Sequence, residues 1–239
     1  MNKKVFSIKN VVIVLIIVIV LAAISILVRS NNEELKISKE EGGSVKIETE
    51  KEDKTFVCGE SYVTDFEGNS YKTVKIGDLC WMSENLNSKK DKNGNKIPRE
   101  CFNDDVENCD LYGGLYDWKT ATVACPQGWK LPSDEDYKAM ESALGMDEEE
   151  IDFMGWRYSG DIFYKIIAGG ESGFDALMAG HFDGSYQFKT FGSYGFFWTS
   201  TPHTRRTAIR RYLGIYEKGF VRNMKEREFG FSVRCIKED

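Results

Sequence analysis

Histidine is scarce in this sequence, because His181 and His203 are the only two among 239 residues. Two histidines cannot supply a zinc site with three histidine ligands. The chain also lacks a Gly-x-Ser-x-Gly nucleophile turn, a glycine-rich phosphate loop and a His-Glu-x-x-His helix. Acyl transfer and nucleotide chemistry therefore lack their usual residues, and we expect each histidine to be a loop residue.

The sequence also has no long run of basic residues ahead of its C-terminal part, and its net charge is -6. Binding to nucleic acid depends on a basic surface that neutralises the phosphates. We therefore expect no nucleic acid partner.

Closely spaced cysteine pairs are absent too, since no Cys-x-x-Cys knuckle and no short cluster of cysteine and histidine occurs. The cysteines are even in number and all follow Phe56. This distribution is typical of three disulfides in an exported domain, and it argues against a structural zinc site. The six are Cys58, Cys80, Cys101, Cys109, Cys125 and Cys235.

One long hydrophobic run lies near the N-terminus, over residues 11–28. As a helix it would span about 27 Å, close to the hydrocarbon thickness of a bilayer. The run ends without a clear cleavage site of small residues, so we expect an uncleaved transmembrane anchor in preference to a cleaved signal peptide. Lys3, Lys4 and Lys9 precede the run and predict a single-pass protein with a cytoplasmic N-terminus and an extracytoplasmic C-terminal domain, in the periplasm or at the cell surface.

Residues 31–55 carry eight acidic and five basic side chains and few apolar ones. So little apolar surface cannot offset the entropy lost on ordering. We interpret the segment as a charged linker between residues 1–30, the tail and anchor, and residues 56–239, one globular domain. The alternation over Ser44 to Glu50 leaves an edge strand as the alternative for that part.

The globular part begins with a predicted hairpin. Tyr71 to Ile76 and Leu79 to Met82 are rich in β-branched and aromatic residues and flank a turn at Gly77-Asp78. Farther along, Ser133 with Asp136 three residues later predicts the start of a helix, and Asp147 with Glu150 repeats this pattern.

Later segments are β-like and punctuated by glycine. Because two short helices come early and the strands come late, we predict an α+β domain with an antiparallel sheet. The predicted strands are Phe174 to Met178, Phe196 to Thr199, Ile209 to Ile215, Phe220 to Met224 and Phe231 to Ile236.

Six sequence blocks carry a resemblance to a known family: Tyr71–Gly77, Trp81–Leu86, Tyr112–Trp118, Cys125–Ser133, Phe197–Thr201 and Gly230–Cys235. In this order they resemble the Fibrobacter succinogenes major paralogous domain family, over about Cys58 to Lys237. The resemblance implies a C-type-lectin-like fold and an exported protein, and it carries no established activity.

Six cysteines can form three disulfides in fifteen different pairings. The lectin-like resemblance implies one of them. Lectin-like folds commonly tie the two ends of the domain together, and this implies a bond between Cys125 and Cys235. The four remaining cysteines would form short-range pairs, Cys58 with Cys80 and Cys101 with Cys109.

The calcium-dependent sugar site of such lectins is not expected here. Its Glu-Pro-Asn or Gln-Pro-Asp motif and the following Trp-Asn-Asp are missing, and Thr201-Pro202-His203 is the one comparable spot. Oxygen ligands do crowd the loop between Cys101 and Cys109. Because their spacing is not that of an EF-hand, we favour a solvated loop over a calcium site and expect no cofactor. The calcium candidates are Asn103, Asp104, Asp105 and Glu107.

Arginine is concentrated between residues 205 and 227, among tyrosine and phenylalanine, and its richness over Ile209 to Arg222 departs from the family pattern. A strand would place Arg210 and Tyr212 on one face and Arg211 on the other. Exposed arginine binds carboxylates and stacks on aromatic rings. The simpler interpretation is a charged sheet edge that resists aggregation. The candidate ligand surface is Arg210, Tyr212 and Arg222.

The anchor, the resemblance and the missing catalytic motifs together predict a membrane-anchored binding or adhesion module. Its ligand would be a polysaccharide or a protein partner, and we expect no catalysis. The distance between two carboxylates cannot be read from a sequence, so a carboxylate-dependent glycan-processing enzyme stays an alternative. A purely structural envelope protein is the other.

Overall fold

The computed structural model describes residues 33–39, 45–51 and 55–238. The chain divides into two compact units, Met1–Phe56 and Val57–Asp239. In the described part of the first unit, β1 (Glu33–Lys39) and β2 (Val45–Lys51) form an antiparallel hairpin, with Ile37 opposite Ile47. β2 lies where the alternation over Ser44 to Glu50 left a strand as the alternative, and the assignment of residues 31–55 as a linker stays a prediction.

The predicted membrane anchor, residues 11–28, lies outside the described residues. Within the described ranges, no helix combines the length and the apolar character that crossing a bilayer requires.

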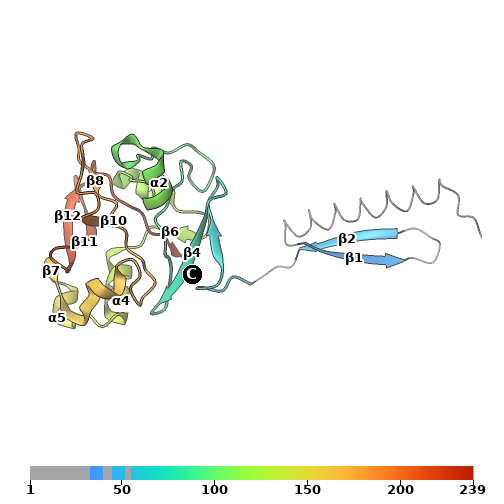
Figure 1. The fold of residues 1–239 in the computed structure, drawn as a ribbon, viewed down its shortest axis with the longest axis horizontal. Helices are drawn as coiled ribbons and strands as arrows, with labels where there is room; N and C mark the ends of the chain where they lie inside the picture. Colours follow the sequence, from blue (N-terminus) through green and yellow to red (C-terminus); the bar gives the residue numbers. More distant parts are fainter. Residues whose placement is uncertain (1–32, 40–44, 52–54, 239) are drawn as a thin grey trace, which may run out of the picture. The chain divides into compact units, whose positions relative to one another are not determined.

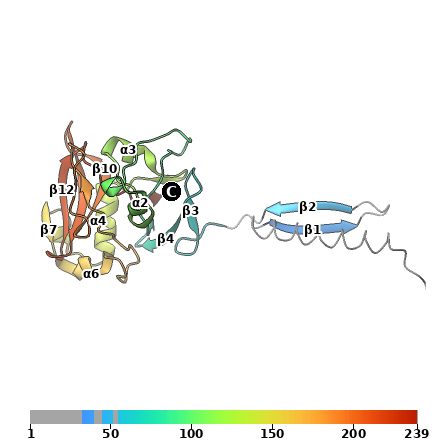
Figure 2. The same ribbon diagram turned by 45° about the horizontal axis from the view of Figure 1, so that its top comes forward.

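Two antiparallel sheets form the framework of the second unit (Figures 1 and 2). One sheet has the strand order β3-β4-β5-β13-β6 and the other β10-β11-β12-β7, while β8 and β9 form a separate pair. The prediction of an α+β domain with an antiparallel sheet is confirmed. The strands are β3 (Tyr62–Thr64), β4 (Ser70–Ile76), β5 (Leu79–Met82), β6 (Trp129–Lys130), β7 (Gly155–Arg157), β8 (His181–Phe182), β9 (Phe188–Lys189), β10 (Tyr194–Pro202), β11 (Thr207–Gly214), β12 (Phe220–Glu226) and β13 (Ile236–Lys237).

The predicted hairpin is confirmed, because β4 pairs with β5 and the two are joined at Gly77 and Asp78. Gly77 has a φ of 60°, a left-handed conformation that glycine adopts without a steric penalty. Two of the predicted late strands are wrong in extent. Ala176 makes an isolated bridge to Ile167, and the last segment is a regular strand only over β13.

The described residues contain more helices than the two predicted. The additional ones have one or two turns, too few for a helical repeat of apolar residues to become visible in a sequence. The helices are α2 (Val106–Tyr112), α3 (Trp118–Ala124), α4 (Asp134–Ala143), α5 (Glu148–Ile151) and α6 (Ile162–Ile166), with the 3-10 helices η1 (Phe102–Asp104) and η2 (Ser159–Asp161).

A core of aromatic side chains joins the two sheets. The ring of Trp81 on β5 packs edge-on against Tyr137 of α4 at 5.0 Å and against Phe174 at 5.7 Å. Phe174 in turn meets Phe197 of β10 at 5.6 Å. All four side chains are buried, so α4 and the loop at Phe174 hold the sheets together through this contact.

Three disulfides connect the second unit, and they have the pairing that the lectin-like resemblance suggested. Their Cα–Cα distances are 5.8 Å for Cys58 and Cys80, 5.0 Å for Cys101 and Cys109, and 5.9 Å for Cys125 and Cys235. The third bond spans 110 residues and ties the end of α3 to the residue before β13.

Candidate functional site

The sheet β10-β11-β12-β7 presents two chemically different faces. Successive side chains of a strand point to opposite faces, and on β11 this separates Arg210 from Arg211. Arg211 lies over the ring of Tyr137 in α4, at 5.3 Å. Arg210 lies over Phe196 and Tyr212 on the opposite face. The inner face therefore packs on α4, and the outer face is lined with rings.

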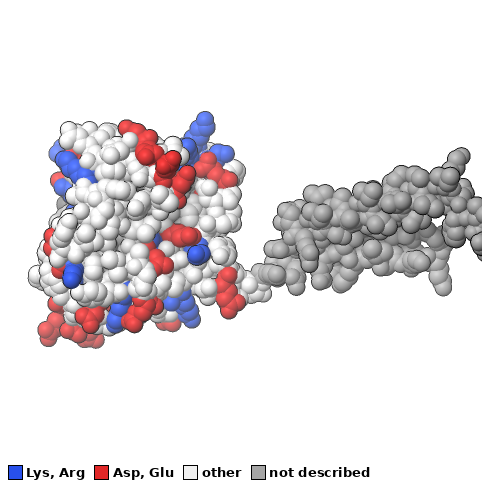
Figure 3. Space-filling model, viewed as in Figure 1, with Lys and Arg blue, Asp and Glu red and all other residues white. Residues whose placement is uncertain are grey.

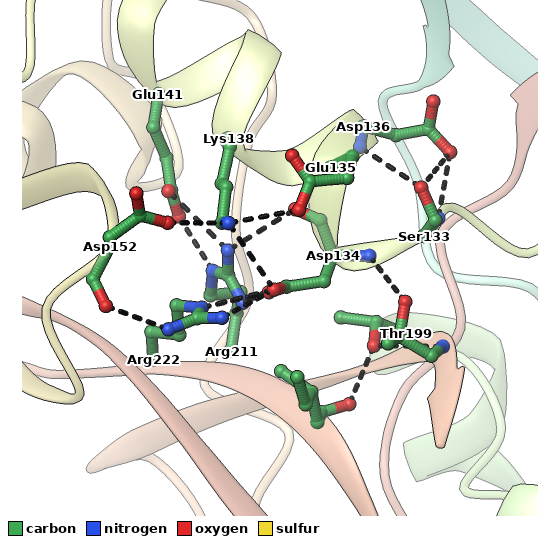
Figure 4. A network of polar contacts seen from close by, with 12 residues as sticks. Ser133, Asp134, Glu135, Asp136, Lys138, Glu141, Asp152, Thr199, Arg211 and Arg222 are labelled. Atoms are coloured by element: carbon green, nitrogen blue, oxygen red, sulfur yellow. Dashed lines mark hydrogen bonds and ion pairs between the residues drawn. The ribbon is translucent and has the colours of Figure 1, made fainter. Parts of the chain in front are cut away.

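The inner face holds a buried ionic network, in which arginines of the sheet reach carboxylates of α4 (Figure 4). Arg211 donates to Glu141 at 2.6 Å and to Asp134 at 2.6 Å. Arg222, opposite Arg211 in the register, donates to Asp134 at 2.6 Å. Arg157 of β7 donates to both oxygens of Glu141 at 2.7 Å. Every buried carboxylate here thus has two arginine partners.

Local sequence signals explain where Asp134 lies. Ser133 caps α4 by accepting from the backbone N–H of Asp136, and Asp136 accepts in return from the N–H of Ser133. The predicted helix start is confirmed. The cap fixes Asp134 as the first helical residue, where the positive end of the helix dipole also favours a carboxylate. By contrast, Asp147 at α5 makes no side-chain cap, and Glu150 accepts from Tyr158 and Ser159 instead.

The pKa of Asp134 predicts a pH effect on stability. Burial alone would raise this pKa, but Arg222 and Arg211 outweigh burial and lower it from 3.8 to about 2. A lowered folded pKa contributes stability above about pH 3.8, and this contribution is lost as the pH falls towards 2. We expect urea unfolding of the full chain between pH 5 and pH 2 to show a steeper loss than that of Asp134→Asn. Equal slopes for the two proteins would contradict the assignment.

The outer face carries a connected series of aromatic rings, which we call the aromatic face: Trp156, Tyr158, Tyr194, Phe196 and Tyr212. Trp156 stacks on Tyr158 at 6.4 Å and meets Tyr212 edge-on at 5.4 Å. Tyr212 continues the series to Phe196 at 5.2 Å and Tyr194 at 6.3 Å. Tyr158 is 52% exposed, and Trp156, Tyr194 and Tyr212 are partly exposed. A ligand can therefore reach several of these rings from the solvent.

Arg210 lies within the aromatic face. Its guanidinium lies 4.9 Å from the ring centre of Phe196, 4.8 Å from that of Tyr212 and 4.7 Å from that of Phe231. Its Nε donates to Asn223 at 2.9 Å. Burial lowers the pKa of Arg210 to about 10, so the side chain stays charged at neutral pH.

The expected ligand surface of Arg210, Tyr212 and Arg222 therefore needs correction. Arg222 lies on the inner face, because its register partner Arg211 does and because both bind Asp134. Arg210 and Arg222 are 9% and 8% exposed, so neither forms a charged outer edge. Arg210 and Tyr212 do share the outer face, as the strand pattern predicted.

A polar groove of about 670 Å³ lies elsewhere on the second unit. Many of its hydrogen-bonding groups already have partners within the protein. Asn85 donates to the carbonyl of Tyr112 and accepts from Arg234, and Asn87 accepts from Arg99. Three carboxylates also line it, those of Glu84, Asp110 and Asp175.

The calcium candidates are not gathered around one point. Asp105 caps α2 by accepting from the N–H of Glu107, and both residues are exposed. In the part of the chain that the structure describes, no three acidic, histidine or cysteine side chains are grouped as a metal site would require. His181 lies at β8, between the rings of Phe196 and Phe229, and burial lowers its pKa to about 4. His203 follows β10.

Trp156, Tyr158 and the carboxylate Glu141 are not among the site residues predicted from the sequence. Trp156 and Tyr158 are two residues apart, which is the spacing that puts both rings on one face of an extended chain. Glu141 follows Tyr137 by four residues, so it shares the buried side of the helix with that ring. Both spacings are visible in the sequence, but only the neighbouring strands show which side chains lie opposite these residues.

Charge on the molecular surface is mixed. In the view of Figure 3, acidic and basic side chains are interspersed with uncharged ones, and acidic atoms gather near α5. No large basic area lies on the face of the second unit that this view shows.

Comparison with known proteins yields a family match. The family model described as the Fibrobacter succinogenes major domain matches residues 74–237, which include both the ionic network and the aromatic face. No curated protein and no solved structure matches the chain.

Proposed function

Because the chain belongs to the Fibrobacter succinogenes major domain family, we propose that it is an exported binding module whose aromatic face holds a polysaccharide. Residues 11–28 would anchor it in a membrane, with the second unit outside the cytoplasm. The observation that carries the proposal is the series of partly exposed rings on one sheet face, from Tyr158 through Trp156 to Tyr212.

The chemistry of these rings suits a sugar chain. Tyrosine and tryptophan combine a flat apolar ring with a polar tip, so they pack against the C–H faces of sugar rings and still hydrogen-bond at the edge. The rings of Trp156, Phe196 and Tyr212 stand on strands of one sheet, and Tyr158 directly follows β7. A rigid surface of this kind keeps the entropy lost on binding small. The groove offers fewer rings and more polar groups that are already paired.

A binding measurement on two surface variants tests the proposal. We expect the full chain, purified in mild detergent, to bind at least one plant or bacterial polysaccharide in a pull-down. Tyr158→Ala should weaken this binding by about tenfold or more, since truncating a tyrosine that contacts the ligand often costs over 1 kcal/mol. Leu111→Ala removes an exposed side chain of the groove and is the matched control. Loss in the control variant instead would move the site to the groove, and no binding at all would favour a structural envelope protein.

A second candidate function rests on the carboxylates of the groove. Glu84, Asp110 and Asp175 line one open concavity, and glycosidases act through two such groups. We expect no new reducing ends when the chain is incubated with the polysaccharides that it binds. New reducing ends that disappear in Glu84→Gln, Asp110→Asn or Asp175→Asn would establish the enzyme in place of the binding module.

We also propose a C-type-lectin-like fold for the second unit. Its support is that β13, near the C-terminus, pairs with β5 and β6, so that distant parts of the domain meet in one sheet. The disulfide between Cys125 and Cys235 links the end of α3 to the residue before β13, next to this pairing. Superposition of an experimental structure of the chain on lectin-like domains would test this proposal.

A further inference from the structure

We infer that the aromatic face selects polysaccharides that carry carboxylates, and that Arg210 is the residue that binds the anionic group. The inference rests on the proposed function and names the chemical class of its ligand. Arg210 differs from the other buried arginines in the acceptors that surround its guanidinium.

The other buried arginines have strong acceptors. Arg157, Arg211 and Arg222 each contact a carboxylate at 2.7 Å or less. Arg234 donates to the carbonyl oxygen of Asp175 at 2.8 Å and to Asn85 at 2.6 Å. A buried arginine in this protein is thus normally neutralised or fully hydrogen-bonded.

Arg210 has neither kind of partner among the residues that the structure describes. Within the described ranges, its hydrogen bond joins Nε to the amide oxygen of Asn223, and no carboxylate forms an ion pair with it within 4.0 Å, although the charge of Glu226 acts on it from farther away. Rings take the place of acceptors, since three ring centres lie within 4.9 Å. The attraction between a cation and rings offsets part of the cost of burial, but it leaves the terminal N–H groups unused.

These unused donors have the geometry that a carboxylate fits. A guanidinium is a planar fork that binds the two oxygens of a carboxylate through parallel hydrogen bonds. Because 9% of the Arg210 surface still faces solvent, a group at the end of a bound sugar can reach it. Tyr212 contacts Arg210 and is itself partly exposed, so one sugar ring could stack there while its carboxylate meets the guanidinium.

The charges around Arg210 favour an anion. Lys225 is partly exposed, and its Nζ lies 4.1 Å from the ring centre of Phe229 and 3.0 Å from Glu226. Glu226 attracts both Lys225 and Arg210, so these three side chains together keep one positive charge. His181 adds no charge at neutral pH, because its pKa is lowered to about 4.

Two polymers with the same backbone give a direct test. Polygalacturonate carries a carboxylate on each sugar, and fully methyl-esterified polygalacturonate carries none. We expect the full chain to bind the free acid at least tenfold more tightly than the ester. Dextran sulfate, which carries sulfates and no carboxylates, tests whether any anionic polymer binds equally well. We expect it to bind more weakly than polygalacturonate.

Variants then assign the preference to Arg210. Arg210→Met should bind both polygalacturonate forms equally, at the affinity of the wild type for the ester. Arg205→Met makes the same change at an exposed arginine and should keep the tenfold preference. Arg210→Lys keeps the charge without the fork and should retain only part of the preference. Near-ultraviolet circular dichroism checks that each variant is folded.

Three results would overturn the inference. These are equal binding of the acid and the ester by the wild type, an Arg210→Met variant that keeps the preference, and tighter binding of dextran sulfate. The first comparison uses the wild type alone, so it decides the matter even if Arg210→Met does not fold. If the wild type binds neutral polysaccharides through Tyr158 but shows no preference for the acid, the inference fails and the proposed function stands. Absence of binding to every polymer would contradict both.

Discussion

Glu141→Gln should lower the free energy of unfolding by about 3–5 kcal/mol, the cost of removing one partner from a buried ion pair. Glu141 is fully buried and accepts hydrogen bonds from Arg157 and Arg211. A glutamine keeps the shape of the side chain but removes the charge that compensates two buried guanidinium groups. Urea unfolding of the full chain at pH 7 measures the difference from the wild type.

Glu135→Gln is the matched control for this variant. Glu135 also lies on α4 and contacts Lys138 at 2.9 Å, but its side chain is 78% exposed. An exposed pair of this kind contributes about 0–1 kcal/mol, so the control should change stability little. If Glu141→Gln cost no more than Glu135→Gln, the buried network would not be a major source of stability.

Removing the bond between Cys125 and Cys235 should have an effect of similar size. The double variant Cys125→Ala with Cys235→Ala opens a loop of 110 residues. In the chain-entropy model, a bond that closes a loop of this length stabilises by about 4–5 kcal/mol, because it restricts the unfolded chain. Thermal and urea unfolding should both show the loss.

The bond between Cys101 and Cys109 provides the comparison, since it spans eight residues. The same model gives about 2–3 kcal/mol for so short a loop. Replacing both of these cysteines with alanine should therefore cost less than replacing Cys125 and Cys235. The reverse order would show that local packing around the sulfurs, and not loop length, sets their contribution.

Patterns that depend on neighbouring residues could be read from the sequence. The hairpin at Gly77 is an example, because its strand residues and its turn residue are contiguous. The helix start at Ser133 is another, because the cap and its partner Asp136 are three residues apart. Residues that are close together in the sequence determine both features.

Contacts between distant segments could not be read in this way. Asp134 follows the cap residue Ser133, and it binds two arginines that lie 77 and 88 residues away and that no local pattern indicates. Arg222 was placed with Arg210 as one surface, although the register between β11 and β12 puts it beside Arg211. Strand register decides which side of the sheet each arginine occupies, and a single sequence does not contain it.

The position of β13 has a consequence for the order in which the chain can fold. β13 lies between β5 and β6, so the five-stranded sheet stays split until residues 236–237 arrive. During synthesis β5 and β6 therefore each keep an unpaired side until Ile236, which lies far downstream of both strands, has been made. Such non-local closure slows folding and leaves an open strand edge to which other chains can add. A chain truncated before Ile236 would keep both strand edges open, and we expect it to aggregate more readily than the full chain.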